Sequence, residues 1–287
     1  MPPVAILIVN YRTYDELDSC LSSIARHEPD ADITVVDHEA NEALGRAMAT
    51  AYPRVHYLPS RSNPGFGAGV NLAARRTTAP LLLLVNPDVE LGGPASGPLA
   101  DCLRRHPTVG IVGGRLREAD GSLQLTARAF PDLTTAFGGR TSWLTRVAPN
   151  NPLARRNLGD SAASDATVVD WVAGAFMLVR RDVFEALGGF DERFFLYWED
   201  ADLCRRAKEA GWQTMYEPTV EAVHLAARAS RHAPVRSLAA FHRSVFRYYW
   251  KHGTWVARAC APLVAVGLAV RFASRLLGSL AHAERSG

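Results

Sequence analysis

Short apolar blocks alternate with stretches of helical periodicity in the first third of the chain. Continuous apolar runs bounded by polar or turn residues are typical of strands buried on both faces of a parallel sheet. The predicted strands are Val4–Val9, Ile33–Asp37, Val55–Leu58 and Leu81–Val85. The predicted helices between them are Asp15–His27, Glu42–Tyr52 and Val70–Arg76, with Thr13 as a candidate N-cap of the first. This alternation predicts an α/β domain with a mostly parallel sheet and right-handed crossovers.

The pattern continues, with one long interruption, to residue 224. The further predicted elements are the helix Pro94–His106, the strand Val109–Gly113, the strand Val168–Val179, the helix Arg181–Leu187 and the strand Gln213–Val223. The segment Arg115–Asp170 is rich in Pro, Gly, Asn and Arg, and we interpret it as a partly mobile excursion over the sheet. A loop of this length is uncommon in a compact domain unless it is functional.

The last part of the chain has a different charge balance. Residues 1–224 carry 22 Lys and Arg against 28 Asp and Glu, whereas residues 225–287 carry 10 against one. Two stretches there, Ser237–His252 and Trp255–Leu280, mix a helical stripe of apolar residues with arginines. We therefore expect a body at 1–224 and a basic amphipathic helical tail at 225–287. The tail would lie on an anionic membrane surface, or pack on the body or on a second subunit.

Composition narrows the class of protein. The chain has 287 residues, 48% of them hydrophobic, which is enough for one large domain with an appendage. Its four cysteines form no CxxC pair, so neither a zinc cluster nor a disulfide framework is indicated, and a reducing cytosol fits. The apolar runs Val4–Val9 and Ala259–Val270 are too short for a signal-peptide core and for a bilayer span, respectively. Nothing in the sequence indicates a nucleic-acid partner.

A candidate ligand site follows the strand Leu81–Val85. Pro87 cannot donate to a strand ladder, so the strand should end before it. Ligands of open α/β sheets bind beyond the carboxyl ends of the strands, and carboxylate oxygens suit Mg²⁺ or Mn²⁺. Asp88 is therefore a candidate metal ligand. The alternative is that Asn86 and Asp88 only form a turn or cap a helix.

A second candidate site is Glu199-Asp200, which follows five apolar residues, four of them aromatic. A carboxyl group against apolar walls has a raised pKa, which suits a general base. The alternative is that these acids complement the dipole of the helix that they begin, and Asp202 with Arg206 forms an i,i+4 pair. His224, at the end of the last strand, is either structural or a second metal ligand.

A glycine-rich loop, Asn63–Asn71, precedes the fourth strand. Gly65, Gly67 and Gly69 have the spacing G-x-G-x-G after the third strand, whereas the dinucleotide fingerprint requires G-x-G-x-x-G after the first. This excludes the usual dehydrogenase interpretation. The glycines would still permit close approach of the backbone to a ligand, and the helix N-terminus that follows would suit an anion.

These residues together resemble a known family. Four features carry the resemblance: Ile8–Tyr11, the loop Asn63–Asn71, Asn86-Pro87-Asp88, and Gly174-Ala175 with Gly189–Asp191 and Tyr197–Leu203. In this order and spacing the chain resembles the family 2 glycosyltransferases of the GT-A fold, and within them the bacterial rhamnosyltransferase-like branch. The resemblance covers about Val4 to His224.

The resemblance implies an inverting sugar transfer from a nucleotide diphosphate sugar, with dTDP-rhamnose as the expected donor. The residues expected to bind it are Asn10, Tyr11, Arg12, Asp37, Asn63, Gly65, Gly67, Asn71, Asn86 and Asp88. Asp37 would hold the base. Asp88, with His224, would hold Mg²⁺ or Mn²⁺ at the diphosphate. Asp200, or alternatively Glu199, would take the proton from the acceptor hydroxyl.

The resemblance also suggests the acceptor. It would be a glycan or a polyprenyl-diphosphate-linked sugar of a cell-envelope polysaccharide, contacted by Gly174, Trp198, Arg247 and Lys251. The protein would then be cytoplasmic and peripheral at the inner face of the cytoplasmic membrane. Two alternatives stay open: a sugar-phosphate nucleotidyltransferase and a non-catalytic binding protein on the same scaffold. His38-Glu39-Ala40-Asn41 departs from the family pattern after Asp37, as does Asn86 from the usual acid of the metal motif.

Overall fold

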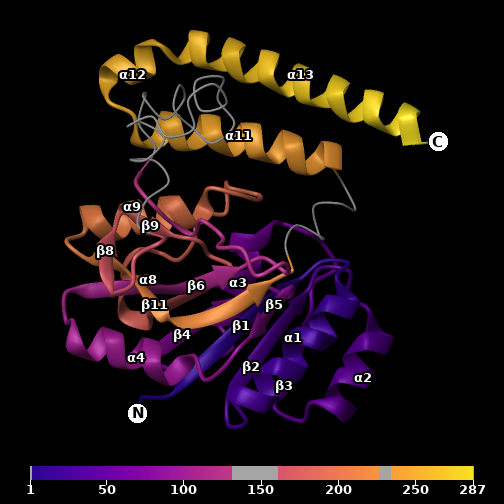
Figure 1. Cartoon of the computed structure of the whole chain (residues 1–287), viewed down its shortest axis with the longest axis vertical. Coiled ribbons are helices and arrows are strands. Elements are labelled where there is room, and N and C mark those ends of the chain that lie inside the picture. Colours follow the sequence, from indigo (N-terminus) through magenta and orange to yellow (C-terminus); the bar gives the residue numbers. More distant parts are fainter. Residues whose placement is uncertain (1, 131–160, 226–233, 287) are drawn as a thin grey trace.

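The computed structural model describes residues 2–130, 161–225 and 234–286. Within them, nine strands form one sheet in the order β3-β2-β1-β4-β10-β6-β11-β5, and β8 pairs with β11 (Figure 1). β1 to β4 lie parallel, β10 is antiparallel between β4 and β6, β11 is parallel to β6, and β5 is antiparallel at the edge. The mostly parallel α/β sheet predicted from the sequence is confirmed.

The strands of the body are set by runs of buried apolar residues. In chain order they are β1 Val4–Asn10, β2 Asp32–Asp37, β3 Val55–Pro59, β4 Leu81–Val85, β5 Val89–Leu91, β6 Val109–Arg117, β7 Ala127–Arg128, β8 Thr167–Val169, β9 Trp171–Val172, β10 Phe176–Arg180 and β11 Gln213–His224. β7 and β9 form a separate two-stranded sheet. The first four strands agree with the predicted strands to within one residue at each end.

Helices cover both faces of the sheet. They are α1 Tyr14–His27, α2 Glu42–Ala51, α3 Phe66–Ala74, α4 Ser96–Arg105, α8 Arg181–Ala186 and α9 Glu199–Glu209, followed by α11 Pro234–His252, α12 Trp255–Ala259 and α13 Ala261–Ser286. Alternate residues of β1 face opposite sides, so Ile6 and Ile8 pack with α1, α2 and α4, whereas Ala5 and Leu7 pack with α3, α8 and α9.

The structure corrects several element boundaries. The predicted strand Val168–Val179 is divided into β8, β9 and β10. Between β9 and β10, the Gly174 N–H donates to the Asp200 carboxylate and not to a neighbouring strand. α3 begins at Phe66, four residues before the predicted start. Thr13 precedes α1 but does not cap it, since its hydroxyl donates to Asn10 Oδ1. Much of the predicted excursion, 131–160, lies outside the described residues.

The tail begins with a helix that packs on the body. Figure 1 shows α11 above the sheet domain and α13 folded back along α11. Tyr248 of α11 is buried and packs against Trp198 with the two rings tilted, and Ser244 Oγ donates to the Leu196 carbonyl. α11 thus follows the packing interpretation of the tail. Among the described helices, none combines the length and the hydrophobicity that crossing a membrane requires.

Candidate functional site

Backbone contacts link the two predicted acidic centres, Asp88 and Glu199-Asp200, at the carboxyl end of β4. Asp88 follows the end of β4, where the Asn86 N–H donates to the Ala175 carbonyl at 2.9 Å. The adjacent Gly174 N–H donates to Asp200 Oδ2 at 3.0 Å. A short chain of contacts therefore connects the β4 end to the first turn of α9, across more than a hundred residues of sequence. These backbone contacts link the two centres, and a shared role of Asp88 and Asp200 on one substrate stays a prediction.

Asp88 is paired with His224, the last residue of β11. His224 Nε2 lies 3.0 Å from Asp88 Oδ1, and both side chains are largely buried. On the other side of the ring, Nδ1 lies 2.9 Å from Gln124 Oε1, and Gln124 Nε2 donates to Glu118 Oε1 at 3.1 Å. The Glu118 contact fixes the amide, so Nδ1 of His224 must carry the proton. In the neutral ring, the Nε2 lone pair then faces the Asp88 carboxylate.

This arrangement fits a divalent cation. A lone pair and a carboxylate oxygen at 3.0 Å repel each other unless a proton or a cation lies between them. In the part of the chain that the structure describes, no group of three His, Cys, Asp or Glu side chains forms a ready-made metal site. Asp88 and His224 would therefore supply two ligands, and a substrate diphosphate and water the others, as is usual for Mg²⁺.

The two carboxylates that begin α9 differ in exposure. Glu199 is 5% exposed, and its Oε2 has no hydrogen-bond partner among the described residues. Burial, followed by the neighbouring Asp200, raises the pKa of Glu199. Asp200 is half-buried, and burial raises its pKa against the opposing effect of the Gly174 and Ala201 N–H donors. Because Asp200 is the more accessible carboxylate, the geometry favours it over Glu199 as a base.

The backbone before these carboxylates is held in an unusual conformation. Tyr197 and Trp198 have φ values of 67° and 72°, in the left-handed region that residues with a Cβ rarely adopt. Such residues cost about 1–3 kcal/mol each and concentrate at functional sites. Their rings pack against Phe241 of α11, which holds the turn in place. The strained turn directs the first residues of α9 toward the sheet edge.

The glycines of the loop before α3 approach the protein's own chain. A Cβ on Gly65, whose φ is 109°, would lie 2.2 Å from the Phe195 carbonyl oxygen, and the Phe66 N–H donates to that oxygen. A Cβ on Gly67 would lie 2.8 Å from Phe190. The Asn63 side chain accepts from the Gly65 N–H. The close approach that we expected toward a ligand is thus made toward the segment that leads into α9.

Asn71 joins the same two segments. Its amide nitrogen donates to the Phe190 carbonyl and to Glu192, and its oxygen accepts from the Phe190 N–H. Both amide N–H groups of Asn71 and one lone pair of its oxygen are therefore occupied, and the side chain is only 7% exposed. The structure therefore gives Asn71 a bridging role between α3 and the loop after α8, and its contact with a nucleotide sugar stays a prediction.

Asn10 and Asp37 lie side by side at the ends of β1 and β2. Both are fully buried, and Asn10 Nδ2 donates to Asp37 Oδ1. Asp37 also accepts from the backbone of Glu39 and Asn41 and from the Tyr57 hydroxyl. A nucleobase could bind Asp37 directly only by displacing one of these donors. The geometry supports a positioning role for Asp37 in the turn that follows β2.

Near the ends of β1 and β2, the more accessible side chains are Tyr11 and Arg12. Arg12 is exposed, has a φ of 61°, lies over the Tyr11 ring and pairs with Glu39 at 2.6 Å. Tyr11 and Arg12 thus stay candidates for direct contact with a nucleotide. Asn86 is half-buried beside Asp88, and its backbone joins β4 to the Gly174 loop.

Sequence reasoning missed two polar residues of the site. Gln124 orients His224, and the charge of Arg128 opposes the rise in the pKa of Asp200, so Arg128 lies near the proposed base. The Arg128 guanidinium also lies over the Trp171 ring. Both residues lie in the described segment after β6, where only the two-residue strand β7, which contains Arg128, is regular and no periodicity places a side chain. The long excursion itself was the available signal, because such loops are often functional.

The four predicted acceptor residues lie in different surroundings. The Gly174 N–H donates to Asp200, and Trp198, two residues before Asp200, packs on α11. Both residues therefore lie beside the predicted general base. Arg247 lies over the Phe194 ring. Lys251 Nζ is bonded to Asp191 and to Asp202 at 2.7 Å each, so it is already paired with two carboxylates.

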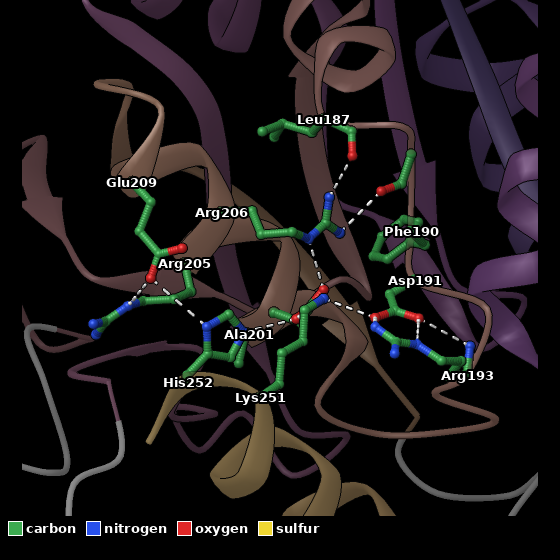
Figure 2. Close-up of polar contacts among 12 residues, drawn as sticks. Leu187, Phe190, Asp191, Arg193, Ala201, Arg205, Arg206, Glu209, Lys251 and His252 are labelled. Atoms are coloured by element: carbon green, nitrogen blue, oxygen red, sulfur yellow. Dashed lines mark hydrogen bonds and ion pairs between the residues drawn. The ribbon is translucent and has the colours of Figure 1, made fainter. Parts of the chain in front are cut away.

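Lys251 belongs to a polar cluster that joins α11 to α9. Figure 2 shows Lys251 and His252 directed toward the residues of α9 and of the loop before it. The fully buried Asp202 accepts from Lys251, His252 Nε2 and, as predicted, Arg206. Burial opposes the charge of Asp202, but these three donors outweigh it and lower its pKa. The tail helix is therefore tied to the third carboxylate of the predicted acidic motif.

Comparison with known proteins gives a consistent set of similarities. The family model described as "Glycosyltransferase like family 2" matches residues 2–251. A Mycobacterium tuberculosis protein described as N-acetylglucosaminyl-diphospho-decaprenol L-rhamnosyltransferase is 32% identical over 267 residues, which are 87% of this chain and 85% of that protein. Rhamnosyltransferase WbbL of Escherichia coli is 44% identical over 89 residues, 31% of this chain and 33% of that protein.

A solved structure shows the same arrangement of elements. The mannosyltransferase PcManGT from Pyrobaculum calidifontis, in complex with GDP-Man and Mn²⁺, superposes with a TM-score of 0.57 and 16% sequence identity. The match covers 98% of this chain and 80% of that protein. At this identity the likeness concerns the fold.

Proposed function

The chain belongs to glycosyltransferase family 2, and from this premise we propose that it transfers L-rhamnose from dTDP-rhamnose to a polyprenyl-diphosphate-linked sugar. It is an inverting glycosyltransferase with a GT-A-type fold, as the sequence motifs predicted. The family match sets aside the nucleotidyltransferase alternative. The transferred sugar and the acceptor class correspond to the name of the mycobacterial relative, whereas dTDP as the donor nucleotide follows the resemblance seen in the sequence. The observation that supports the proposal is the Asp88–His224 pair at the end of β4, which the Asn86–Ala175 and Gly174–Asp200 contacts link to the first turn of α9.

In the proposed reaction, Asp200 acts as the base. The acceptor hydroxyl gives its proton to Asp200 as its oxygen bonds to the anomeric carbon, and the bond from that carbon to the nucleotide diphosphate breaks with the electron pair on the phosphate oxygen. Attack opposite the leaving group inverts the configuration. Glu199, buried with a raised pKa, stays protonated beside Asp200 and so adds no second negative charge. A divalent cation held by Asp88 and His224 would stabilise the charge on the leaving diphosphate.

The direct test of this proposal is a transfer assay with metal removal. We expect transfer from dTDP-rhamnose to a polyprenyl-diphosphate-linked N-acetylglucosamine in the presence of Mg²⁺ or Mn²⁺, and loss of transfer in excess chelator. Restoration by either cation would identify the one that is used. Gln124→Leu should raise the cation concentration needed, since outer contacts of this kind affect metal affinity by about 10–100-fold. Full transfer in chelator would remove Asp88 and His224 from a metal role.

We further propose that α12 and α13 contact the inner face of the cytoplasmic membrane. Large apolar side chains are exposed there, with Trp255 81%, Leu263 75%, Val266 63% and Val270 65% exposed. The tail also has a strong excess of positive charge, and apolar residues mixed with cations suit the interface of an anionic membrane. A second copy of the chain could instead cover this face, which would make a homo-oligomer.

Vesicle flotation separates these two occupants. The full chain should float with phosphatidylglycerol vesicles, and the triple variant Leu263→Ser/Val266→Ser/Val270→Ser should float much less. Val168→Ser, which removes an apolar side chain that is 49% exposed on the body, is the matched control and should float normally. Unchanged flotation of the triple variant, or a shift in its oligomer size instead, would contradict membrane contact.

A further inference from the structure

A groove of about 920 Å³ lies between α11 and α13. The two helices lie side by side in Figure 1, and His242 of α11 packs edge-to-face on Phe272 of α13 with ring centroids 5.6 Å apart. One set of groove side chains is positively charged: Arg193, Arg243, Arg247, Lys251 and Arg258. No carboxylate is among the described residues that line it. A groove with this lining should attract an anion.

Two of these cations have no carboxylate partner among the described residues. Arg193 pairs with Asp191, Lys251 is bonded to two carboxylates, and Arg258 donates to the last carbonyls of α11. Arg243 and Arg247, by contrast, have no such ion pair in the described ranges. They are four residues apart on α11, and like charges at this spacing destabilise a helix. A bound anion would offset this repulsion.

The other groove residues exclude a purely polar ligand. Phe246 and Trp250 of α11 face Leu268 and Phe272 of α13 across the groove. Phe246 and Trp250 stack with their ring centroids 6.4 Å apart, so they present a continuous apolar surface beside the two arginines. Inorganic phosphate or a nucleotide sugar would gain little from this surface. The lining fits a molecule that carries a phosphate group on a hydrocarbon chain.

The groove adjoins the loop that leads to the proposed base. Arg193 belongs to this loop, and Arg247 and Lys251 both lie over the ring of Phe194. The opposite side of α11 packs on Trp198, the residue before Glu199. A ligand held at the arginines would therefore lie one helix away from the turn that begins α9.

We propose that this groove binds the diphosphate and the first prenyl units of the acceptor lipid, with Arg243 and Arg247 on the phosphates. The proposal rests on the proposed function for the identity of the lipid, but its binding step can be measured without transfer. Arg243 and Arg247 supply charge-assisted hydrogen bonds, and the facing apolar side chains bury the hydrocarbon. The sugar at the end of the diphosphate would then extend past Arg193 toward Asp200.

Binding of farnesyl diphosphate, which has no sugar, tests the groove in the full chain. Titration calorimetry of the wild type should give saturable binding. Arg243→Gln/Arg247→Gln should weaken it at least about 10-fold, since each lost charge-assisted bond removes on the order of a tenfold factor. Arg243→Gln alone should weaken it less. Arg275→Gln, which removes the same charge from an exposed position of α13 outside the groove, is the control and should bind normally.

Transfer kinetics provide the second measurement. The double variant should raise the KM for the lipid acceptor while leaving affinity for dTDP-rhamnose unchanged. Unaltered farnesyl diphosphate binding by the double variant would overturn the proposal, as would equal weakening by Arg275→Gln. Loss of phosphatidylglycerol vesicle binding without loss of farnesyl diphosphate binding would assign the groove to membrane phospholipid instead. If no nucleotide sugar supports transfer, the proposed function fails, and the farnesyl diphosphate result still decides the groove.

Discussion

Asp200→Asn is expected to reduce the kcat of sugar transfer by about 10²–10⁴-fold, because a positioned general base contributes a factor of this size. The amide keeps the shape of the side chain and can still accept from the Gly174 N–H, as Asp200 does at 3.0 Å. It cannot take a proton from the acceptor hydroxyl. Affinity for the donor nucleotide, measured by calorimetry, should change little, since Asp200 makes no contact with Asp88 or His224.

The pH dependence gives an independent check on the same residue. The base must be deprotonated to act, and burial raises the pKa of Asp200. Activity should therefore fall with decreasing pH at a higher pH than for an ordinary aspartate, and this acidic limb should vanish in the residual activity of Asp200→Asn. Glu199→Gln is the matched control and should retain most of the transfer. If Glu199→Gln were inactive and Asp200→Asn active, the roles of the two carboxylates would be reversed.

Asp202→Asn is expected to lower the free energy of unfolding by roughly 3 kcal/mol, near the low end of the cost of breaking a buried ion pair. The substitution leaves the charges of Arg206 and Lys251, and the ring of His252, without their shared carboxylate. The lower end applies because Lys251 is 23% exposed and keeps Asp191. Denaturant unfolding measures the change directly.

The control for Asp202 is an exposed pair on α4, away from the cluster. Arg104 and Asp101 lie 3.2 Å apart with partly exposed side chains, and such pairs contribute about 0–1 kcal/mol. Asp101→Asn should therefore change the unfolding free energy by far less. Equal effects of the two substitutions would show that the buried cluster does not hold α11 on the body.

The wild type should also lose stability at low pH. Because the pKa of Asp202 is lowered in the folded state, its contribution to the free energy of unfolding is lost as the pH falls and the carboxylate protonates.

The sequence predicted the parts of the fold that depend on local patterns. Leu81–Val85 was recognised as a buried strand from its apolar run alone, and Pro87 marked its end. β5 was missed, because three residues carry no periodicity and the strand is defined only by pairing with β11. The break at Gly174 was missed for a related reason: the Asp200 side chain that takes the Gly174 N–H comes from 26 residues later.

The sequence identified several residues of the candidate site, but it did not reveal the contacts that these residues make. Asp88 and Asp200 were found because each follows an apolar run, and that pattern places an acid at the edge of a sheet. The roles of Gly65 and Asn71 depend on contacts with Phe195 and Phe190, which no local pattern reveals. Gln124 acts through His224, a hundred residues away, so only the folded chain identifies it.

The amide bridge between Asn71 and Phe190 has a consequence for biosynthesis. The two residues are 119 positions apart, and the glycine turn before α3 is closed by the same late segment. While a ribosome is still translating the middle of the chain, α3 has no covering partner, even though β1 to β4 are complete. The nascent N-terminal half therefore exposes the surface that the segment between α8 and α9 later covers, and activity can arise only after most of the polypeptide has emerged.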